Sequence, residues 1–310
     1  MRRKSSADIK NLKGRMPIVC LTAYTAPIAR AIDDAGDLLL VGDSLGMVLY
    51  DYENTLPVTI DQMIEHSKSV VKASKKSCVI VDLPFGSYEE SVDKAFMNAA
   101  RVMKETNCNG VKLEGGQNMF NTIKYLTSRS IPVMGHIGLQ PQSVLLDGGY
   151  KVKGKNKFDW QKYIDDALAV EEGGAFSVVL EGMAEPLAAE ITSILKIPTI
   201  GIGASPKCDG QILVTEDMLG LTNVAPKFVK KYINLDKLIK NSVSQYALDV
   251  RNRVFPGSEH TYEMNVQIIK NVHLAKIINP LNQIKSKMVF ILVNIPKLDL
   301  FYDKKNIYFN

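Results

Sequence analysis

Leu38-Leu-Leu-Val-Gly-Asp-Ser44 is the stretch of sequence that decides the fold, a short apolar run that ends at a carboxylate. The same arrangement returns in Val79-Ile-Val-Asp82 and in Gly110-Val-Lys-Leu-Glu114. Short apolar runs rich in β-branched residues predict strands. Strands of this kind therefore recur along the chain, and the segments between them decide how they associate.

The chain contains eight such runs, at Ile18–Ala23, Leu38–Val41, Cys78–Val81, Gly110–Leu113, Pro132–Gly135, Phe176–Leu180, Pro198–Ile202 and Gln211–Thr215. Apolar residues at three- and four-residue spacing predict helices between them, at Ala26–Ala35, Ile60–Ala73, Ser87–Thr106, Gln117–Arg129, Trp160–Glu172 and Ala184–Leu195. Alternating strands and helices require a parallel sheet with right-handed crossovers. Eight repeats favour an α/β fold closed into a (β/α)8 TIM barrel over an open doubly wound sheet, and no G-x-G-x-x-G follows the first strand.

Three parts of the chain lie outside this repeat. Ile137–Lys157 is rich in Gly, Gln and Lys and is long for a loop between strand and helix, which is typical of a lid at a catalytic face. Further helices are predicted at Phe228–Tyr232 and Asp236–Val254. The remainder is rich in Asn, Ile and Lys. We therefore predict a barrel domain over residues 1–262 and a C-terminal extension over residues 263–310.

Composition excludes several classes of protein. A net charge of +5 over 310 residues is too mild for a nucleic-acid partner. The four cysteines show no C-x2-4-C spacing, which argues against a zinc site and for buried thiols in a reducing compartment. No apolar stretch follows the basic start, and Met288–Val293 is too short to cross a bilayer. We expect a cytoplasmic protein without a membrane partner.

Five consecutive predicted strands, from the second onward, end in polar side chains: Asp43 with Ser44, then Asp82, Glu114, His136 and Glu181. An α/β barrel places its chemistry at the C-terminal ends of its strands, so these groups are expected to meet at one face. Each residue alone has a simpler interpretation: helix N-caps for Asp43 and Asp82, an ordinary strand end for Glu114, an ion-pair partner for Lys112, a core histidine for His136 and loop surface for Glu181. Together, several unneutralised carboxylates in one barrel mouth would repel one another.

A divalent cation resolves this repulsion. Oxygen ligands from Asp43, Asp82 and Glu114, without a His or Cys cluster, suit Mg²⁺, which shares its remaining positions with water and substrate. The carboxylate and ketone of a 2-oxo acid can chelate such an ion, which acidifies the carbon beside the ketone. Glu181 is the free carboxylate best placed to remove that proton, and Lys112 can hold the negative charge of the substrate. The residues thus predict a magnesium-dependent enzyme that forms C–C bonds.

An ordered set of motifs resembles the ketopantoate hydroxymethyltransferase family, of the superfamily of PEP mutases and isocitrate lyases. The resemblance runs from about residue 5 to 262 and rests on Val41-Gly-Asp-Ser-Leu-Gly-Met47, Thr55-Leu-Pro-Val-Thr59, Asp82-Leu-Pro-Phe85, Val111-Lys-Leu-Glu-Gly-Gly116, Gly135-His-Ile-Gly-Leu139, Pro141-Gln-Ser143, Gly148-Gly-Tyr-Lys-Val152, Gly201-Ile-Gly-Ala204, Asp209-Gly-Gln-Ile-Leu-Val214 and Phe255-Pro-Gly257. Tyr50-Asp-Tyr-Glu-Asn54 and Ser205-Pro206 depart from the family pattern in loops.

The resemblance implies a (β/α)8 barrel, a homo-oligomer and often a decamer, that transfers a hydroxymethyl group from 5,10-methylenetetrahydrofolate to 3-methyl-2-oxobutanoate and forms 2-dehydropantoate. It implies Mg²⁺ on Asp43, Asp82 and Glu114, and Glu181 as proton acceptor. Its substrate contacts map onto Asp43, Ser44, Asp82 and Lys112. We also place His136 among the substrate-binding residues, on the folate side, with a structural role beside the site as the alternative.

Two rival functions stand beside this one. Another magnesium-dependent 2-oxo-acid enzyme, similar to the PEP mutases and isocitrate lyases, would share the barrel and the metal, but the Lys-Cys-Gly-His type motif of the lyases is absent. A non-catalytic barrel that acts as a scaffold would be favoured by loss of a metal carboxylate or of Glu181, and all of these residues are present.

Overall fold

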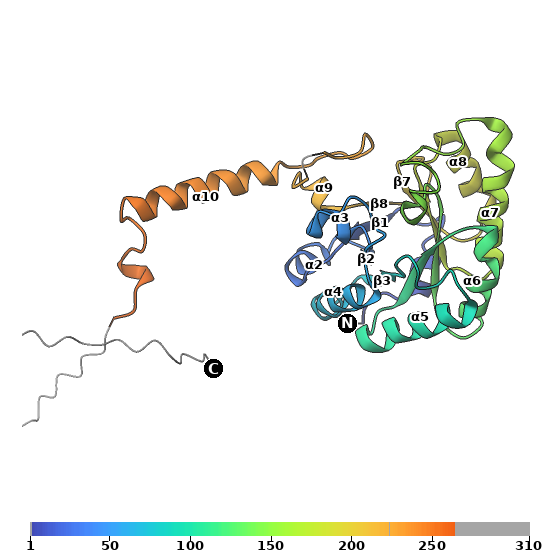
Figure 1. Cartoon of the computed structure of the whole chain (residues 1–310), viewed down its shortest axis with the longest axis horizontal. Coiled ribbons are helices and arrows are strands. Elements are labelled where there is room, and N and C mark those ends of the chain that lie inside the picture. Colours follow the sequence, from blue (N-terminus) through green and yellow to red (C-terminus); the bar gives the residue numbers. More distant parts are fainter. Residues whose placement is uncertain (1, 223, 264–310) are drawn as a thin grey trace, which may run out of the picture. The chain divides into compact units, whose positions relative to one another are not determined.

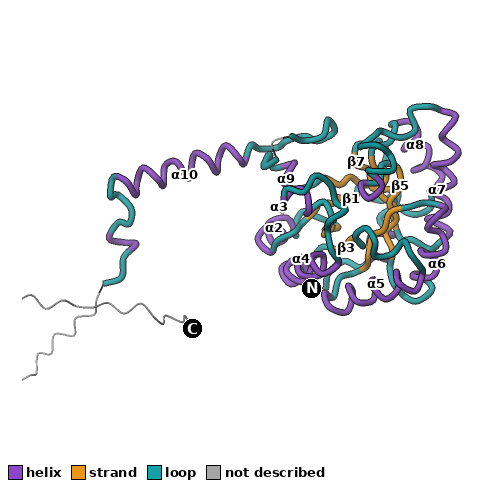
Figure 2. The backbone as a smooth tube through the Cα atoms, in the orientation of Figure 1, coloured by secondary structure: helices purple, strands orange, loops and turns teal. Residues whose placement is uncertain are grey.

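The computed structural model describes residues 2–222 and 224–263. The chain divides into two compact units, Met1–Tyr246 and Ala247–Asn310, and each is described by itself. The first unit is a closed barrel of eight parallel strands in chain order, with helices packed around them (Figures 1 and 2). The predicted TIM barrel is confirmed.

All eight predicted runs form strands, with ends within a few residues of those expected. They are β1 (Ile18–Thr22), β2 (Leu38–Val41), β3 (Cys78–Asp82), β4 (Gly110–Glu114), β5 (Val133–Gly138), β6 (Ser177–Glu181), β7 (Thr199–Ile202) and β8 (Gly210–Leu213). β1 pairs with both β2 and β8, which closes the sheet. Closure leaves no strand edge with unpaired backbone groups.

The six helices predicted between the strands are also present. The α-helices are α1 (Ser6–Lys10), α2 (Ala26–Ile32), α3 (Leu45–Tyr50), α4 (Ile60–Ala73), α5 (Val92–Thr106), α6 (Phe120–Thr127), α7 (Trp160–Glu172), α8 (Glu185–Ile194), α9 (Thr215–Met218) and α10 (Leu235–Arg251). Short 3-10 helices occupy Gln117–Met119, Pro141–Ser143, Lys157–Asp159 and Ser258–His260. Among the described residues, no helix has the length and apolarity needed to span a bilayer.

The helix predicted at Phe228–Tyr232 is wrong, because that segment makes tertiary contacts in place of helical hydrogen bonds. The Tyr232 N–H donates to the Met218 carbonyl at 2.9 Å. The Phe228 ring lies so close to Gly203 that an added Cβ there would meet it at 2.6 Å. The helix predicted at Asp236–Val254 is α10, which begins one residue earlier and ends at Arg251. The predicted extension from residue 264 onward lies outside the described residues, so the boundary at 262 stays a prediction.

Alternation along the strands separates two apolar cores. One cluster fills the barrel and contains alternate residues of every strand except β4, with Ile18, Cys20, Leu38, Leu40, Cys78, Ile80, Met134, Val179, Ile200 and Ile212 among its members. The other cluster lies between the strands and the surrounding helices. Because side chains alternate with a period of two, the residue two positions beyond an inward-pointing one also points inward. Asp82 follows Ile80, His136 follows Met134 and Glu181 follows Val179 in this way.

Asp33 ties the end of α2 to the segment that leads into β3. Its buried carboxylate accepts the backbone N–H groups of Lys75 at 2.7 Å, Lys76 at 3.0 Å and Ser77 at 3.0 Å, and the Ser74 hydroxyl. Burial acts to raise the pKa of Asp33, but these hydrogen bonds outweigh it and lower the pKa to about 2. The charged form therefore stabilises the fold.

Asp33→Ala is expected to lower the free energy of unfolding by about 2–3 kcal/mol, because it leaves three backbone donors without their acceptor. The folded-state pKa lies below the ordinary 3.8, so this stabilisation is present above about pH 4 and is lost as pH falls toward 2. Urea unfolding at pH 7 measures the effect. Asp34→Ala is the control, since the exposed Asp34–Lys76 ion pair is worth less than about 1 kcal/mol. Equal losses in the two variants would contradict the prediction.

Candidate active site

Strand register brings the predicted charged residues together at the C-terminal ends of the strands. Asp82 on β3 is the neighbour of Lys112 on β4, and their charged atoms, Oδ1 and Nζ, are 2.9 Å apart. Glu114 on β4 is the neighbour of His136 on β5. Glu181 ends β6, and its Oε2 lies 3.2 Å from His136 Nε2. These five side chains thus form one chain of contacts across four strands.

Asp43 and Ser44 join the cluster from the turn between β2 and α3. The Asp43 backbone N–H donates to Asp82 Oδ2 at 3.1 Å. Ser44 Oγ hydrogen-bonds to Tyr24 Oη at 2.8 Å. A Cβ placed on Gly42 would meet both Ser44 Oγ, at 2.9 Å, and Asp82 Oδ2, at 3.5 Å, so these two oxygens lie on the same side of the turn.

The helix-cap interpretations of Asp43 and Asp82 are wrong. Ser44 is the N-cap of α3, and no side chain caps that helix. The helix after Asp82 begins at Val92, and its cap is Ser91, whose hydroxyl accepts the Lys94 N–H. The carboxylates of Asp43 and Asp82 therefore do not cap helices, and they contact Gln142 and Lys112 respectively.

Burial distinguishes three of the carboxylates from the fourth. Asp43, Asp82 and Glu114 are only 4%, 2% and 6% exposed, whereas the side chain of Glu181 is 20% exposed. Burial and then the nearby carboxylates of Asp82 and Glu114 raise the pKa of Asp43 above its usual value. Burial also raises the pKa of Asp82, although Lys112 acts against this rise. The cluster therefore holds more negative charge than its own cations compensate.

Two basic side chains lie among the carboxylates. Burial acts to lower the pKa of Lys112, but Asp82, Glu114 and Asp43 outweigh it, so the pKa is raised and the amine stays charged. Burial and Lys112 likewise oppose a charge on His136, yet Glu114 and Glu181 raise its pKa to about 9. With four ionised carboxylates and two cations, the cluster would carry two formal negative charges.

His136 is enclosed between these charged groups and is 2% exposed. Its Nδ1 lies 3.4 Å from Glu114 Oε1 and 3.2 Å from Lys112 Nζ. A protonated ring nitrogen can only donate, so the contact with Glu114 is the one compatible with a charged ring. His136 thus lies between Glu114, Lys112 and Glu181, and its assignment as a substrate-binding residue on the folate side stays a prediction, with a structural role as the alternative.

The residues fit a hard divalent cation by their chemistry. Asp43, Asp82 and Glu114 offer only oxygen donors, and the excess negative charge equals that of one such ion. Asp82 Oδ1 is buried, faces Lys112 and makes no regular hydrogen bond in the described part of the chain. Among the described residues, no three Asp, Glu, His or Cys side chains are already arranged so that they could coordinate one metal ion together. Asp43, Asp82 and Glu114 would be the residues that hold such an ion.

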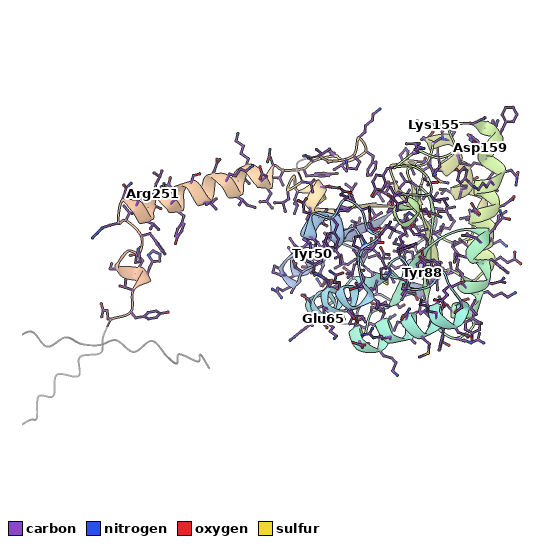
Figure 3. All side chains as sticks on the ribbon, viewed as in Figure 1. Tyr50, Glu65, Tyr88, Lys155, Asp159 and Arg251 are labelled. Atoms are coloured by element: carbon purple, nitrogen blue, oxygen red, sulfur yellow. The ribbon has the colours of Figure 1, made fainter. Side chains whose placement is uncertain are left out.

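Sequence reasoning missed three residues that support the cluster: Gln142, Tyr88 and Tyr24. Gln142 donates to Asp43, and Tyr88 Oη accepts the Glu114 N–H at 3.1 Å. Tyr88 lies within the barrel unit among densely packed side chains (Figure 3). None of the three lies in a predicted strand, so the alternation along strands carries no signal for them. Tyr88 falls in the predicted helix Ser87–Thr106 but precedes α5, which begins only at Val92. For Gln142 the one signal is that Pro141-Gln-Ser143 is a family motif.

Comparisons with known proteins show which proteins this chain is similar to. A family model described as ketopantoate hydroxymethyltransferase matches residues 3–258. A Rhizobium etli protein is 56% identical over 263 residues, which cover 84% of this chain and 96% of that protein. A Caulobacter vibrioides protein is 54% identical over 262 residues, which cover 84% of this chain and 95% of that protein. Both relatives are named 3-methyl-2-oxobutanoate hydroxymethyltransferase.

Solved structures with the same fold are far more distant in sequence. A phosphoenolpyruvate phosphomutase from Streptomyces platensis subsp. rosaceus matches with a TM-score of 0.55 at 10% identity, covering 90% of this chain and 96% of its own. A 2,3-dimethylmalate lyase, described as a member of the PEP mutase/isocitrate lyase superfamily, matches with a TM-score of 0.51 at 14% identity, covering 82% and 98%. At these identities the likeness shows the fold alone.

Proposed function

The chain belongs to the ketopantoate hydroxymethyltransferase family, and from this premise we propose that it is a 3-methyl-2-oxobutanoate hydroxymethyltransferase of pantothenate biosynthesis. It transfers a hydroxymethyl group from 5,10-methylenetetrahydrofolate to 3-methyl-2-oxobutanoate and forms 2-dehydropantoate. The observation that carries this proposal is the line of contacts from Asp82 through Lys112 and His136 to Glu181. It places charged side chains that can bind an oxo acid next to the more solvent-exposed carboxylate of Glu181, which can act as a base.

Asp43, Asp82 and Glu114 would hold Mg²⁺ in the proposed enzyme. When bound, Mg²⁺ polarises the ketone of the oxo acid and so increases the acidity of the C3 proton. Lys112 stays charged beside Asp82 and can bind the negative substrate. Ser44, whose hydroxyl is held by Tyr24 at 2.8 Å, can bind a substrate oxygen. Lys112 and Ser44 would thereby fix how the substrate lies in the site.

Glu181 is the base in this proposal. Its greater exposure suits a group that must return its proton to solvent after each reaction. His136 Nε2 lies 3.2 Å from Glu181 Oε2 as an ion pair without regular hydrogen-bond geometry, so a charged His136 attracts the Glu181 carboxylate. The folate methylene carbon is bonded to two folate nitrogens, and one of these bonds opens to give an iminium, with the electron pair and a proton going to that nitrogen. After Glu181 takes the C3 proton, C3 forms a bond to the iminium carbon. Water then displaces the second folate nitrogen from that carbon, supplies the hydroxyl group and gives its proton to that nitrogen.

The setting of the enzyme is also part of the proposal. The four cysteines are free and buried, which supports a reducing cytoplasm. The homo-oligomer implied by the resemblance, often a decamer, would be measured by analytical ultracentrifugation. No nucleic-acid partner is expected at a net charge of +5.

The proposed function is tested by incubating the full chain with 3-methyl-2-oxobutanoate, 5,10-methylenetetrahydrofolate and Mg²⁺, and measuring 2-dehydropantoate by mass spectrometry. Product is expected to form, to stop when EDTA removes the metal, and to return when Mg²⁺ is added in excess. Product formation that continues unchanged in EDTA would contradict the metal requirement. Absence of product under all conditions would contradict the function itself.

A further inference from the structure

Gln142 lies in the 3-10 helix Pro141–Ser143, outside the strands, yet its side chain reaches the centre of the site and is 7% exposed. The amide Nε2 donates to Asp43 Oδ2 at 2.8 Å and to the Leu83 carbonyl at 3.0 Å. The amide Oε1 accepts the Tyr88 hydroxyl at 2.6 Å. Both protons of the NH2 group and the amide oxygen are therefore in use.

The surroundings permit only one orientation of this amide. The Leu83 carbonyl can only accept, so the NH2 group must face it and, with it, Asp43. The Tyr88 oxygen already accepts the Glu114 N–H at 3.1 Å, so its single proton is available for Gln142 Oε1. A reversed amide would place its oxygen against a carbonyl and a carboxylate. Gln142 is thus fixed on Asp43 as a donor.

The backbone of Gln142 adds a contact to a second carboxylate. Its N–H donates to Glu114 Oε2 at 3.1 Å. The other oxygen of Glu114, Oε1, lies 3.4 Å from His136 Nδ1. Gln142 therefore donates to one oxygen of Asp43, Oδ2, and to one oxygen of Glu114, Oε2. The lone pairs of these carboxylates that accept no hydrogen bond from Gln142 can bind another partner.

We propose that Gln142 is a positioning residue that determines which oxygens of Asp43 and Glu114 face a bound divalent cation, and thereby sets the affinity for Mg²⁺. This inference rests on the magnesium site of the proposed function. Mg²⁺ demands near-octahedral geometry, so the direction of each carboxylate matters to its binding. Groups that orient metal ligands typically contribute about 10- to 100-fold in metal affinity.

The contacts of Gln142 make the beginning of the long segment between β5 and Lys157 part of the site. That segment is joined to the barrel again where the Lys153 N–H donates to the Gly182 carbonyl at 2.8 Å and the Ala184 N–H donates to the Lys153 carbonyl at 2.9 Å. Between these anchors, Leu145 and Leu146 are 75% and 90% exposed. The segment is therefore attached to the barrel at both ends, and Gln142 lies at the end nearer β5.

The test is Gln142→Met, which keeps the length of the side chain and removes both donors to Asp43 and Leu83. Titration calorimetry with Mg²⁺ alone, on the metal-free full chain, is expected to show a dissociation constant at least about tenfold weaker than wild type. Gln161→Met is the matched control, because Gln161 Nε2 also donates to an aspartate, Asp165, at 2.8 Å, but on the exposed face of α7. The control is expected to bind Mg²⁺ like wild type.

Tyr88→Phe is a second variant, which keeps the inference testable where Gln142→Met does not fold. It removes the proton that orients the Gln142 amide, so it is expected to weaken Mg²⁺ binding by less than Gln142→Met does. Tyr88→Phe also removes the acceptor of the Glu114 N–H, so only the part of its effect that passes through Gln142 is shared with Gln142→Met. Because of that shared part, the double variant should bind less weakly than the product of the two separate effects would give. The melting temperature of each metal-free variant separates this loss from a general loss of stability.

The results distinguish this inference from the function on which it rests. Wild-type chain that binds Mg²⁺, together with folded Gln142→Met and Tyr88→Phe that bind it within about twofold of wild type, would overturn the role of Gln142 and leave the proposed function intact. Wild-type chain that binds no Mg²⁺ would overturn the metal site itself. Weakened binding in Gln142→Met, with an unchanged Gln161→Met, is the supporting result.

Discussion

Glu181→Gln is expected to slow the exchange of the C3 proton of 3-methyl-2-oxobutanoate with solvent by a factor of roughly 10² to 10⁴, the usual contribution of a positioned base. Glutamine has the same shape but cannot take the proton, and its amide can still face His136, which lies 3.2 Å from the present carboxylate. Mg²⁺ binding should stay near that of wild type, because Glu181 is not among the three predicted ligands. Proton NMR in D2O, with enzyme and Mg²⁺ but without folate, measures the exchange directly.

Glu190→Gln is the control for this measurement. Glu190 is an exposed residue of α8, so the variant makes the same chemical change away from the site. It should exchange the C3 proton at the wild-type rate. Exchange at that same rate in Glu181→Gln would mean that another group is the base. Because the assay omits folate, it reports on proton removal and not on the later transfer.

Asp82→Asn is expected to reduce formation of 2-dehydropantoate at least a hundredfold, on the scale measured for fixed electrostatic groups in active sites. Asp82 is 2% exposed, pairs with Lys112 at 2.9 Å and accepts the Asp43 N–H at 3.1 Å. Asparagine can keep the hydrogen bond to Asp43, but it removes one negative charge from the cation site. We therefore expect Mg²⁺ to bind at least about tenfold more weakly, as measured by calorimetry.

Asp147→Asn provides the matched comparison, because Asp147 also pairs with a lysine, Lys153, at 2.6 Å, but outside the barrel interior. That variant should keep Mg²⁺ binding within about twofold of wild type, as expected for a partly exposed pair. If Asp82→Asn also kept both Mg²⁺ affinity and activity at this level, Asp82 would be neither a ligand nor a substrate contact. Circular dichroism of both variants confirms that the barrel is folded.

The barrel could be predicted because its signal is local and repeated. Each strand is a short apolar run, and each helix has apolar residues at three- and four-residue spacing, so Ile60–Ala73 and Trp160–Glu172 were predicted to the residue. The segment Phe228–Tyr232 was mispredicted because its conformation is decided by distant contacts, such as that between Tyr232 and Met218. Local preference is a weak guide where tertiary contacts replace helical hydrogen bonds.

The candidate site could be predicted only in part. Asp82, Glu114 and Glu181 follow apolar runs directly. Side chains alternate along a strand, so the inward-pointing Ile80 and Val179 indicate that Asp82 and Glu181, two positions later, also point inward. The residue two positions before Glu114 is Lys112, so no apolar residue gives the direction of Glu114. The sequence alone does not say that Lys112 contacts Asp82, since that depends on the register between β3 and β4. Register is a property of paired strands, and no single run contains it.

The sequence by itself determined the closed barrel and the line of carboxylates at its strand ends, because both follow from periodicities within single segments. Only the tertiary structure decided how far each carboxylate is exposed to solvent. It leaves Glu181 partly exposed and buries Asp43, Asp82 and Glu114. It also brought Gln142 to Asp43, 99 residues earlier in the chain. Loop residues have no period, so their contacts are set by where the folded strands place the ends of the loop.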